Sequence, residues 1–133
     1  MLYLLDTNIC IYLMKKKPIA CFEKLCALEK GNRIAMSVIT LAELEFGIAK
    51  SFHKEKSRQA LHLLLTQLEV LPYTDVCTKY YGVIRSMLTT QGVTIGPNDL
   101  LIASQALSLQ ATLVTHNRKE FDRILDLTVE NWV

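Results

Sequence analysis

Three acidic residues have the type and the placement needed to hold a metal ion. Asp6 follows a short apolar run, Glu43 lies one turn into a predicted helix, and Asp99 begins another helix. Hard cations such as Mg²⁺ and Mn²⁺ prefer carboxylate oxygens and waters as ligands. Such ions activate water and neutralise charge during phosphodiester cleavage. If the fold brings them together, the three acids predict a site for one or two divalent cations.

Each acid, taken alone, also has a structural interpretation. Asp6 could cap the first helix, Thr40 and Glu43 have the spacing of a capping box, and Asp99 could complement a helix dipole. Capping does not require its acids to cluster, whereas a metal site does. Placement at one edge of a sheet would therefore favour the metal site.

Basic residues near these segments are candidates for contact with phosphates. They are Lys15, Lys16, Lys17, Arg118, Lys119 and Arg123, and they follow elements that are expected to end at the edge where the acids lie. A solvated surface explains any one of them equally well. His116 lies near the same edge, but a single histidine in a loop is usually only solvated, and no nucleophile–base pair is present.

Hydrophobic periodicity and turn residues predict alternating strands and helices. Strands are expected at 2–5, 33–37, 70–71, 111–115 and 127–129, and helices at 9–17, 19–30 with Gly31 at the C′ position, 40–48, 53–69, 76–92 and 99–109, with a helical turn near Glu120. This alternation indicates βαβ units and an α/β fold with a mainly parallel sheet covered on both faces. Ligands of such sheets bind beyond the carboxyl ends of the strands, which is where the acids are expected.

Length and composition bound the class of protein. The 133 residues suit one domain spanning 1–133, and 50% hydrophobic with 21% charged residues suits a globular chain. No apolar stretch approaches the roughly 20 residues that span a bilayer, and residues 1–6 lack the features of a signal peptide. We therefore expect a cytoplasmic protein with no membrane partner.

Net charge and cysteine spacing narrow the class of protein only a little further. A formal net charge of +2 is too small to establish nucleic-acid binding. The cysteines, at positions 10, 21, 26 and 77, form no C-x-x-C pair, and no histidine stands at a zinc-binding spacing. We expect four buried, reduced thiols.

Five motifs occur in a recognisable order along nearly the whole chain. They are Leu4-Leu5-Asp6-Thr7-Asn8, Ser37 to Gly47 with Ala42-Glu43-Leu44 inside, Ile95 to Ala103, Leu113-Val114-Thr115-His116-Asn117, and Glu120-Phe121. Together with the terminal Val129 to Trp132, they make the sequence resemble the VapC toxins of the PIN-domain family. Several ordered motifs are much more specific than one.

The resemblance implies a single PIN domain, a three-layer α/β/α sandwich with about five strands, and Mg²⁺- or Mn²⁺-dependent endoribonuclease activity. It implies a homodimer that is neutralised by a VapB-type antitoxin, and an RNA substrate, with tRNA, including initiator tRNA, as the closest analogy. The family's catalytic acids carry over to Asp6, Glu43 and Asp99 as metal ligands. Polar positions that surround the family's site carry over to the following residues: Thr7, Asn8 and Thr115.

One departure from the family pattern concerns the fourth acid. Many PIN domains carry an acid where this chain has Asn117, and an amide is a weaker cation ligand than a carboxylate. Glu120, one helical turn further on, could supply the missing charge, or Asn117 could ligate through its carbonyl oxygen. Two other interpretations stay open: a catalytically silent PIN fold used for protein binding, and a receiver-type domain phosphorylated on Asp6.

Overall fold

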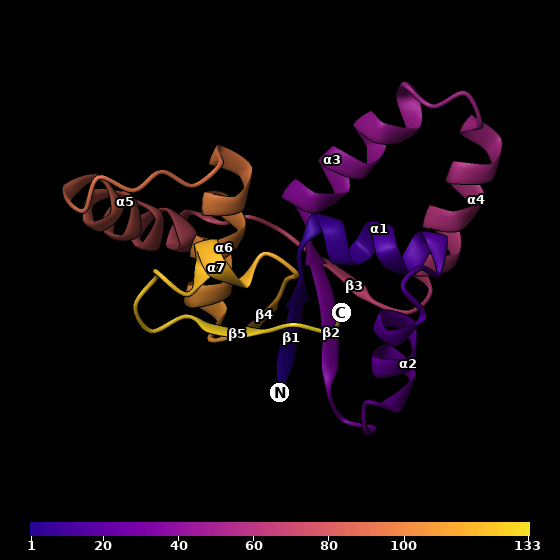
Figure 1. Ribbon diagram of the computed structural model, residues 1–133, viewed down its shortest axis with the longest axis horizontal. Coiled ribbons are helices and arrows are strands. Elements are labelled where there is room, and N and C mark those ends of the chain that lie inside the picture. Colours follow the sequence, from indigo (N-terminus) through magenta and orange to yellow (C-terminus); the bar gives the residue numbers. More distant parts are fainter.

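The computed structural model describes residues 1–133 and contains one five-stranded sheet (Figure 1). The strands are β1 (Leu2–Leu5), β2 (Arg33–Ser37), β3 (Glu69–Leu71), β4 (Thr112–Val114) and β5 (Thr128–Glu130). Their order is β3-β2-β1-β4-β5, and all four pairings are parallel. The expected α/β fold is confirmed, and the sheet is entirely parallel.

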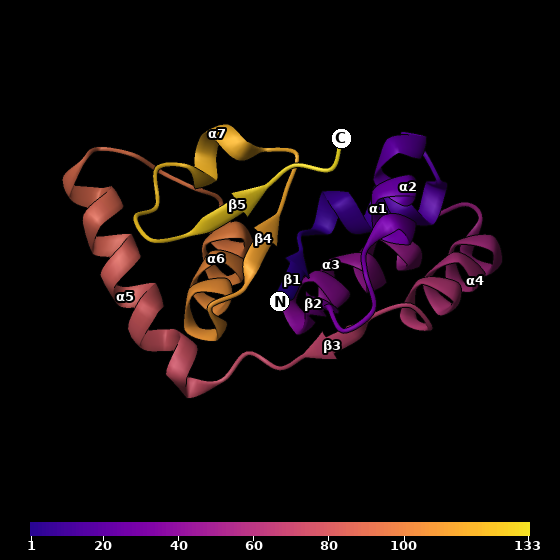
Figure 2. The same cartoon turned by 90° about the horizontal axis from the view of Figure 1, so that it is seen from below.

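Seven helices cover the two faces of the sheet. They are α1 (Thr7–Lys15), α2 (Ile19–Ala27), α3 (Val38–Ala49), α4 (Lys54–Leu65), α5 (Asp75–Thr90), α6 (Pro97–Leu109) and α7 (Arg118–Phe121). In Figure 2, α1 to α4 lie on one side of the sheet and α5 to α7 on the other. The architecture is therefore the expected three-layer α/β/α sandwich.

Two separate cores follow from the alternation of side chains along β1. Tyr3 and Leu5 pack into a core with α1 to α4, whereas Leu4 points to the opposite core with α5 to α7. Leu4 and Leu5 are both fully buried. A central parallel strand is covered on both faces and so reads as a continuous apolar run, which is why residues 2–5 could be identified as a strand.

The strand order places a topological switch point at β1. The chain steps from β1 to β2 and β3 in one direction, then returns to place β4 and β5 on the other side of β1. Crevices at such points, beyond the carboxyl ends of the strands, are the usual ligand sites of open α/β sheets. Asp6 directly follows β1 at this point.

Two predicted helices are too long. α2 ends at Ala27 rather than Lys30, and Gly31, with a φ of 97°, lies in the loop beyond it rather than at the C′ position. α4 ends at Leu65 rather than Glu69, because Glu69 already belongs to β3 and pairs with Ala35. Its carboxylate also accepts two hydrogen bonds from Arg33 at 2.9 and 3.0 Å. Pairing with a neighbouring strand overrides the helical periodicity here.

Other boundaries differ by a few residues. α3 begins at Val38, directly after β2, because the Ser37 hydroxyl accepts a hydrogen bond from the Ile39 N–H and acts as the N-cap. The capping box predicted at Thr40 and Glu43 is therefore wrong. α6 begins at Pro97, a residue whose fixed φ suits the first helical position.

All four cysteines are free thiols, as expected, but they are not all buried. Cys10, Cys21 and Cys77 are buried, whereas Cys26 is exposed near the end of α2. The prediction was wrong for Cys26, since a cysteine can lie on the outer face of a surface helix. None of the helices combines the length and apolar character that crossing a membrane requires.

Candidate metal and catalytic site

Asp6 anchors the site between β1 and α1. Its Oδ1 accepts a hydrogen bond from the Ile9 N–H at 2.9 Å, so the residue is the N-cap of α1, and its side chain is buried. Burial raises the pKa of Asp6, and the charge of Glu43 raises it further, while hydrogen bonds from Thr115 and Ile9 and the charge of His116 lower it. The capping interpretation of Asp6 is confirmed, yet the cap lies within a cluster of charges.

Glu43 is held in place by a hydroxyl from the neighbouring helix. The Thr7 hydroxyl donates to Glu43 Oε1 at 2.6 Å and lies 3.2 Å from the Thr40 hydroxyl. Thr40 is fully buried one turn before Glu43, on the same side of α3. Thr40 is therefore a site residue that the sequence analysis assigned only to capping. Its spacing of three residues from Glu43 was the signal.

Asp99 completes the cluster from the first turn of α6. The pKa of Asp99 is raised from its ordinary 3.8 to about 6, first by burial and then by the negative charges of Asp6, Glu43 and Glu120. Asp99 Oδ2 would lie 3.7 Å from a Cβ at Gly96, so the turn before α6 packs closely against this carboxylate. The fold thus brings together the three acids that were expected to meet.

No lysine or arginine neutralises the three acids. The four ion pairs of the structure engage other carboxylates, those of Glu45, Glu69, Asp122 and Glu130. Clustered carboxylates without cations are unfavourable in a partly buried cleft, and burial together with the neighbouring negative charges raises the pKa values of Asp6 and Asp99. Such an arrangement is typical of a site that receives its positive charge from a bound cation.

Two residues at the α7 end of the site are candidates for the role of the fourth acid. Glu120 is half-buried and lies close enough to raise the pKa of Asp99. Asn117 is exposed at the N-cap position of α7, and its backbone N–H donates to the Thr115 hydroxyl at 3.0 Å. The charge of the cluster therefore comes from Glu120 rather than from the position of Asn117.

Some of the predicted supporting residues contact the acids, and others face the solvent. Thr115 is fully buried beside Asp6, and its hydroxyl accepts from Asn117, which leaves its proton free to be donated to Asp6. Asn8 is exposed in the first turn of α1. His116 is exposed and packs edge-on against Tyr12, with ring centroids 6.2 Å apart. Thr7 and Thr115 support the acids directly, whereas Asn8 and His116 line the solvent side.

The basic candidates do not form one group. Helix α1 begins at the acids and runs away from them for nine residues, about 13 Å, so Lys15 and Lys16 lie at its far end (Figure 1). Lys16 instead lies over the ring of Phe22, 5.8 Å from its centroid. The expectation that these lysines end at the same edge was wrong, because the helix starts there. Arg118 and Lys119 do lie at that edge, in α7, although Arg118 pairs with Asp122 at 3.1 Å.

The donor atoms of the site are carboxylate oxygens, which suit a divalent cation. No group of three histidine, cysteine, aspartate or glutamate side chains lies close enough to form a ready-made cage. Mg²⁺ binds through one or two carboxylates and keeps several waters, so a complete cage is not required. Asp6, Glu43 and Asp99 supply oxygen ligands in an acidic cluster without a cationic partner, and these features fit Mg²⁺ or Mn²⁺.

Comparison with known proteins agrees with this fold. Residues 3–126 match the PIN domain family. The chain therefore belongs to the PIN-domain family, and its similarity to several proteins named as VapC ribonucleases places it in that group.

Three relatives show how close the match is. Ribonuclease VapC2 of Rickettsia felis is 49% identical over 132 residues, which cover 99% of this chain and 98% of the relative. The tRNA(fMet)-specific endonuclease VapC of Shigella flexneri is 36% identical over 130 residues, covering 98% and 97%. The crystal structure of VapBC2 from Rickettsia felis bound to a DNA fragment from their promoter includes a chain that superposes with a TM-score of 0.95 at 48% identity, covering 100% of both chains.

Proposed function

We propose that this chain is a Mg²⁺- or Mn²⁺-dependent endoribonuclease and the toxin of a toxin–antitoxin pair. The observation that carries the proposal is the convergence of Asp6, Glu43 and Asp99 without a cationic partner, reflected in the raised pKa of Asp99. Bound at these carboxylates, a divalent cation would supply charge neutralisation and a more acidic water. A catalytically silent PIN fold would have no need to keep such an unfavourable cluster.

The chain's own groups have separate tasks in this proposal. Asp6 and Glu43 are oriented before substrate arrives, because the Ile9 N–H and the Thr7 hydroxyl each donate to one carboxylate. Asp99, whose pKa is raised to about 6 when no cation is bound, would supply a carboxylate oxygen to the cation, and the cation would favour its charged form. Glu120 adds negative charge at the same end of the cleft and is the better candidate than Asn117 for a fourth ligand.

The substrate and the partner follow from the relatives. The Shigella flexneri protein is named as specific for tRNA(fMet), and we infer that tRNA, including initiator tRNA, is the substrate here. The superposable Rickettsia felis structure is a VapBC complex, and we infer that a VapB-type antitoxin restrains this chain. An RNA substrate and an antitoxin partner agree with action in the cytoplasm. A homodimer stays a prediction, which light scattering on the purified chain tests.

The decisive experiment measures RNA cleavage by the purified chain without antitoxin. We expect cleavage of tRNA with Mg²⁺ or Mn²⁺, none with EDTA, and recovery when the ion is restored. Asp99→Asn should remove the activity while leaving the far-ultraviolet circular dichroism unchanged. Asp126→Asn is the matched control, because Asp126 is exposed, has a φ of 67° that asparagine tolerates, and lies outside the site.

Four outcomes would contradict the proposal. Cleavage that persists in EDTA would exclude the metal. Equal activity of Asp99→Asn and Asp126→Asn would exclude the acidic cluster as the site. A wild-type chain that binds antitoxin but cleaves no RNA under any of these conditions would instead favour the silent binding module. A phosphorylated Asp6 would revive the receiver-type interpretation.

A further inference from the structure

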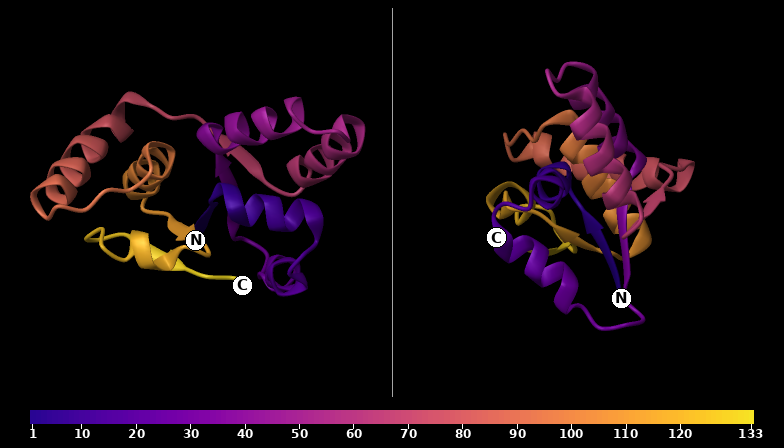
Figure 3. Two further views of the ribbon diagram at one scale, coloured as in Figure 1. Left: turned by 45° about the horizontal axis from the view of Figure 1, so that its top comes forward. Right: turned by 90° about the vertical axis from the view of Figure 1, so that its right-hand side faces the viewer.

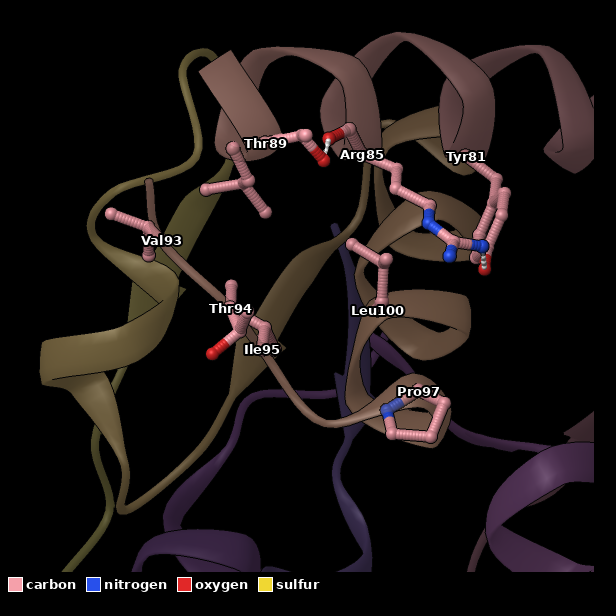
Figure 4. Close-up of a pocket in the computed structure, with 9 residues that line it drawn as sticks. Tyr81, Arg85, Thr89, Val93, Thr94, Ile95, Pro97 and Leu100 are labelled. Carbon is pink, nitrogen blue, oxygen red and sulfur yellow. Dashed lines mark hydrogen bonds between the residues drawn. The ribbon is translucent and has the colours of Figure 1, made fainter. Parts of the chain in front are cut away.

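A cavity of about 260 Å³ lies between α5 and the segment that leads into α6 (Figure 4). Its walls include Tyr81, Arg85 and Thr89 from α5, Val93, Thr94 and Ile95 from the connecting segment, and Pro97 at the start of α6. Leu88 and Leu100 form the apolar floor. No proposed catalytic residue lines the cavity, so it is a separate feature from the acidic cluster.

The cavity and one of the acids share the first turn of α6. Pro97 and Leu100 of the cavity lining belong to this turn, and Asp99 lies on another face of it. Gly96, between Ile95 and Pro97, packs against the Asp99 carboxylate. The short segment from Ile95 to Pro97 therefore lies between the cavity and Asp99, and a polymer lying across the acids would reach the cavity by passing over this segment.

Arg85 gives the cavity a positive charge that no carboxylate of the chain neutralises. Its Nη1 donates to the Tyr81 hydroxyl at 2.9 Å, and its guanidinium lies 5.8 Å from the Tyr81 ring centroid. None of the ion pairs of the chain involves Arg85, whereas Arg33, Arg58 and Arg118 each pair with a carboxylate. A guanidinium carries five N–H donors, so several stay available to a ligand.

We propose that this cavity is a subsite for one nucleotide of the RNA strand beside the cleaved phosphodiester, with Arg85 contacting its phosphate and the base packing against Tyr81. The proposal rests on the proposed ribonuclease function and extends it to a second group of residues. The guanidinium is a bidentate donor for phosphate oxygens, and bases of single-stranded RNA stack on aromatic rings and guanidinium planes.

Size and charge favour a nucleotide over other occupants. Pockets for drug-sized ligands run from about 300 to 1,000 Å³, so this cavity suits a single planar ring rather than a larger molecule. The acidic cluster repels the RNA backbone, whereas Arg85 gives the cavity a cation that attracts a phosphate. A side chain of a partner protein is the competing occupant, and the test below separates the two.

The test measures binding of 3′-fluorescein-labelled tRNA by fluorescence anisotropy in EDTA, where cleavage is absent. Arg85→Gln should weaken binding about tenfold, the loss expected for one charge-assisted contact. It should also reduce the slope of log affinity against log salt by about 1, as loss of one phosphate contact does. Arg85→Lys should retain the salt slope, because it keeps the charge, while recovering only part of the affinity.

The matched control is Lys79→Gln, which removes one positive charge from the same helix outside this cavity. It should change the affinity by no more than about twofold, since it touches only the general field of the protein. Arg85 and Lys79 are both exposed, so both variants should keep the melting temperature of the wild type.

Different results would contradict the subsite proposal and the ribonuclease proposal on which it rests. If Arg85→Gln and Lys79→Gln bind tRNA equally well while the wild type cleaves RNA, the subsite is wrong and the ribonuclease stands. If Arg85→Gln weakens only the binding of the antitoxin, the occupant is a protein. If the wild-type chain neither binds nor cleaves RNA, the subsite falls together with the proposed function.

Discussion

The two helical layers support their acids in different ways. Asp6 and Glu43, on the side of α1 to α4, each accept a hydrogen bond from a group of that layer. The helices α5 to α7 form the other layer, whose ribbons run from rose to yellow in Figure 3. Asp99 of α6 and Glu120 of α7 accept no side-chain hydrogen bond, and Asp99 carries a pKa of about 6. One half of the site is oriented by the fold, and the other half needs a charge that the fold does not supply.

The difference between the two layers predicts different roles for the two pairs of acids. Asp6 and Glu43, which are oriented by hydrogen bonds, can position an ion and its waters. Asp99 and Glu120, which have no hydrogen-bond donors, are stabilised most when a cation binds. Substitutions on the α6 and α7 side should therefore affect metal dependence, whereas substitutions around Thr7 should affect orientation alone. The predictions below test that division, from the largest expected effect to the smallest.

The largest effect is expected for the acids themselves. Asp6→Asn and Asp99→Asn should each lower the rate of tRNA cleavage about a hundredfold or more, because each removes a charge that a cation requires. Expression of the wild-type chain without antitoxin should arrest growth, and neither variant should do so. Growth curves and cleavage rates check this, with Asp126→Asn as the control. Unaffected cells carrying the wild-type chain would refute a toxin.

A smaller effect is expected for Glu120→Gln. It should lower the rate about tenfold and raise the Mn²⁺ concentration needed for half-maximal activity, because it removes the charge that acts on Asp99. The matched comparison is Asn117→Gln, which changes an exposed side chain at the start of the same helix. A loss as complete as that of Asp99→Asn would make Glu120 a primary ligand, and no loss would remove it from the site.

A loss of only a few fold is expected for Thr7→Val. The substitution keeps the side-chain shape and removes the hydroxyl that donates to Glu43 Oε1, a contact of about 1 kcal/mol. The turnover number should fall about fivefold while the metal requirement stays unchanged, since Glu43 keeps its charge. Thr7→Ser should restore most of the rate. A shift in metal requirement equal to that of Glu120→Gln would erase the distinction between the two halves.

The last effect concerns stability without metal and leaves activity aside. The pKa of Asp99 is higher in the folded state than the ordinary 3.8, so folding takes up a proton between about pH 4 and pH 6 and stability falls as the pH rises through that range. Asp99→Asn removes this penalty. At pH 7.5 in EDTA it should stabilise the chain by about 1 to 2 kcal/mol, and at pH 4 the gain should vanish. Urea unfolding at both pH values measures this, and a gain independent of pH would contradict the charge origin.

Much of the fold could be predicted because its signals are local. The apolar run of β1, the N-cap at Asp6 and the Gly-Pro start of α6 each depend on a few adjacent residues. The errors arose where residues outside the local pattern determine the type or the boundary of an element. Glu69 has helical spacing with the residues before it, yet pairing with β2 makes it a strand, and Ser37 rather than Thr40 caps α3 because β2 ends directly at the helix.

The sequence by itself determined the parallel α/β fold and the three acids at its carboxyl edge, since chain order and strand direction follow from apolar patterns and turn residues. Only the tertiary structure decided which neighbours those acids have. It gave Glu43 a donor in Thr7, gave Asp99 the charge of Glu120, and carried Lys15 away from the cleft. Contacts between residues far apart in the chain depend on packing of the two layers, and no local pattern encodes that packing.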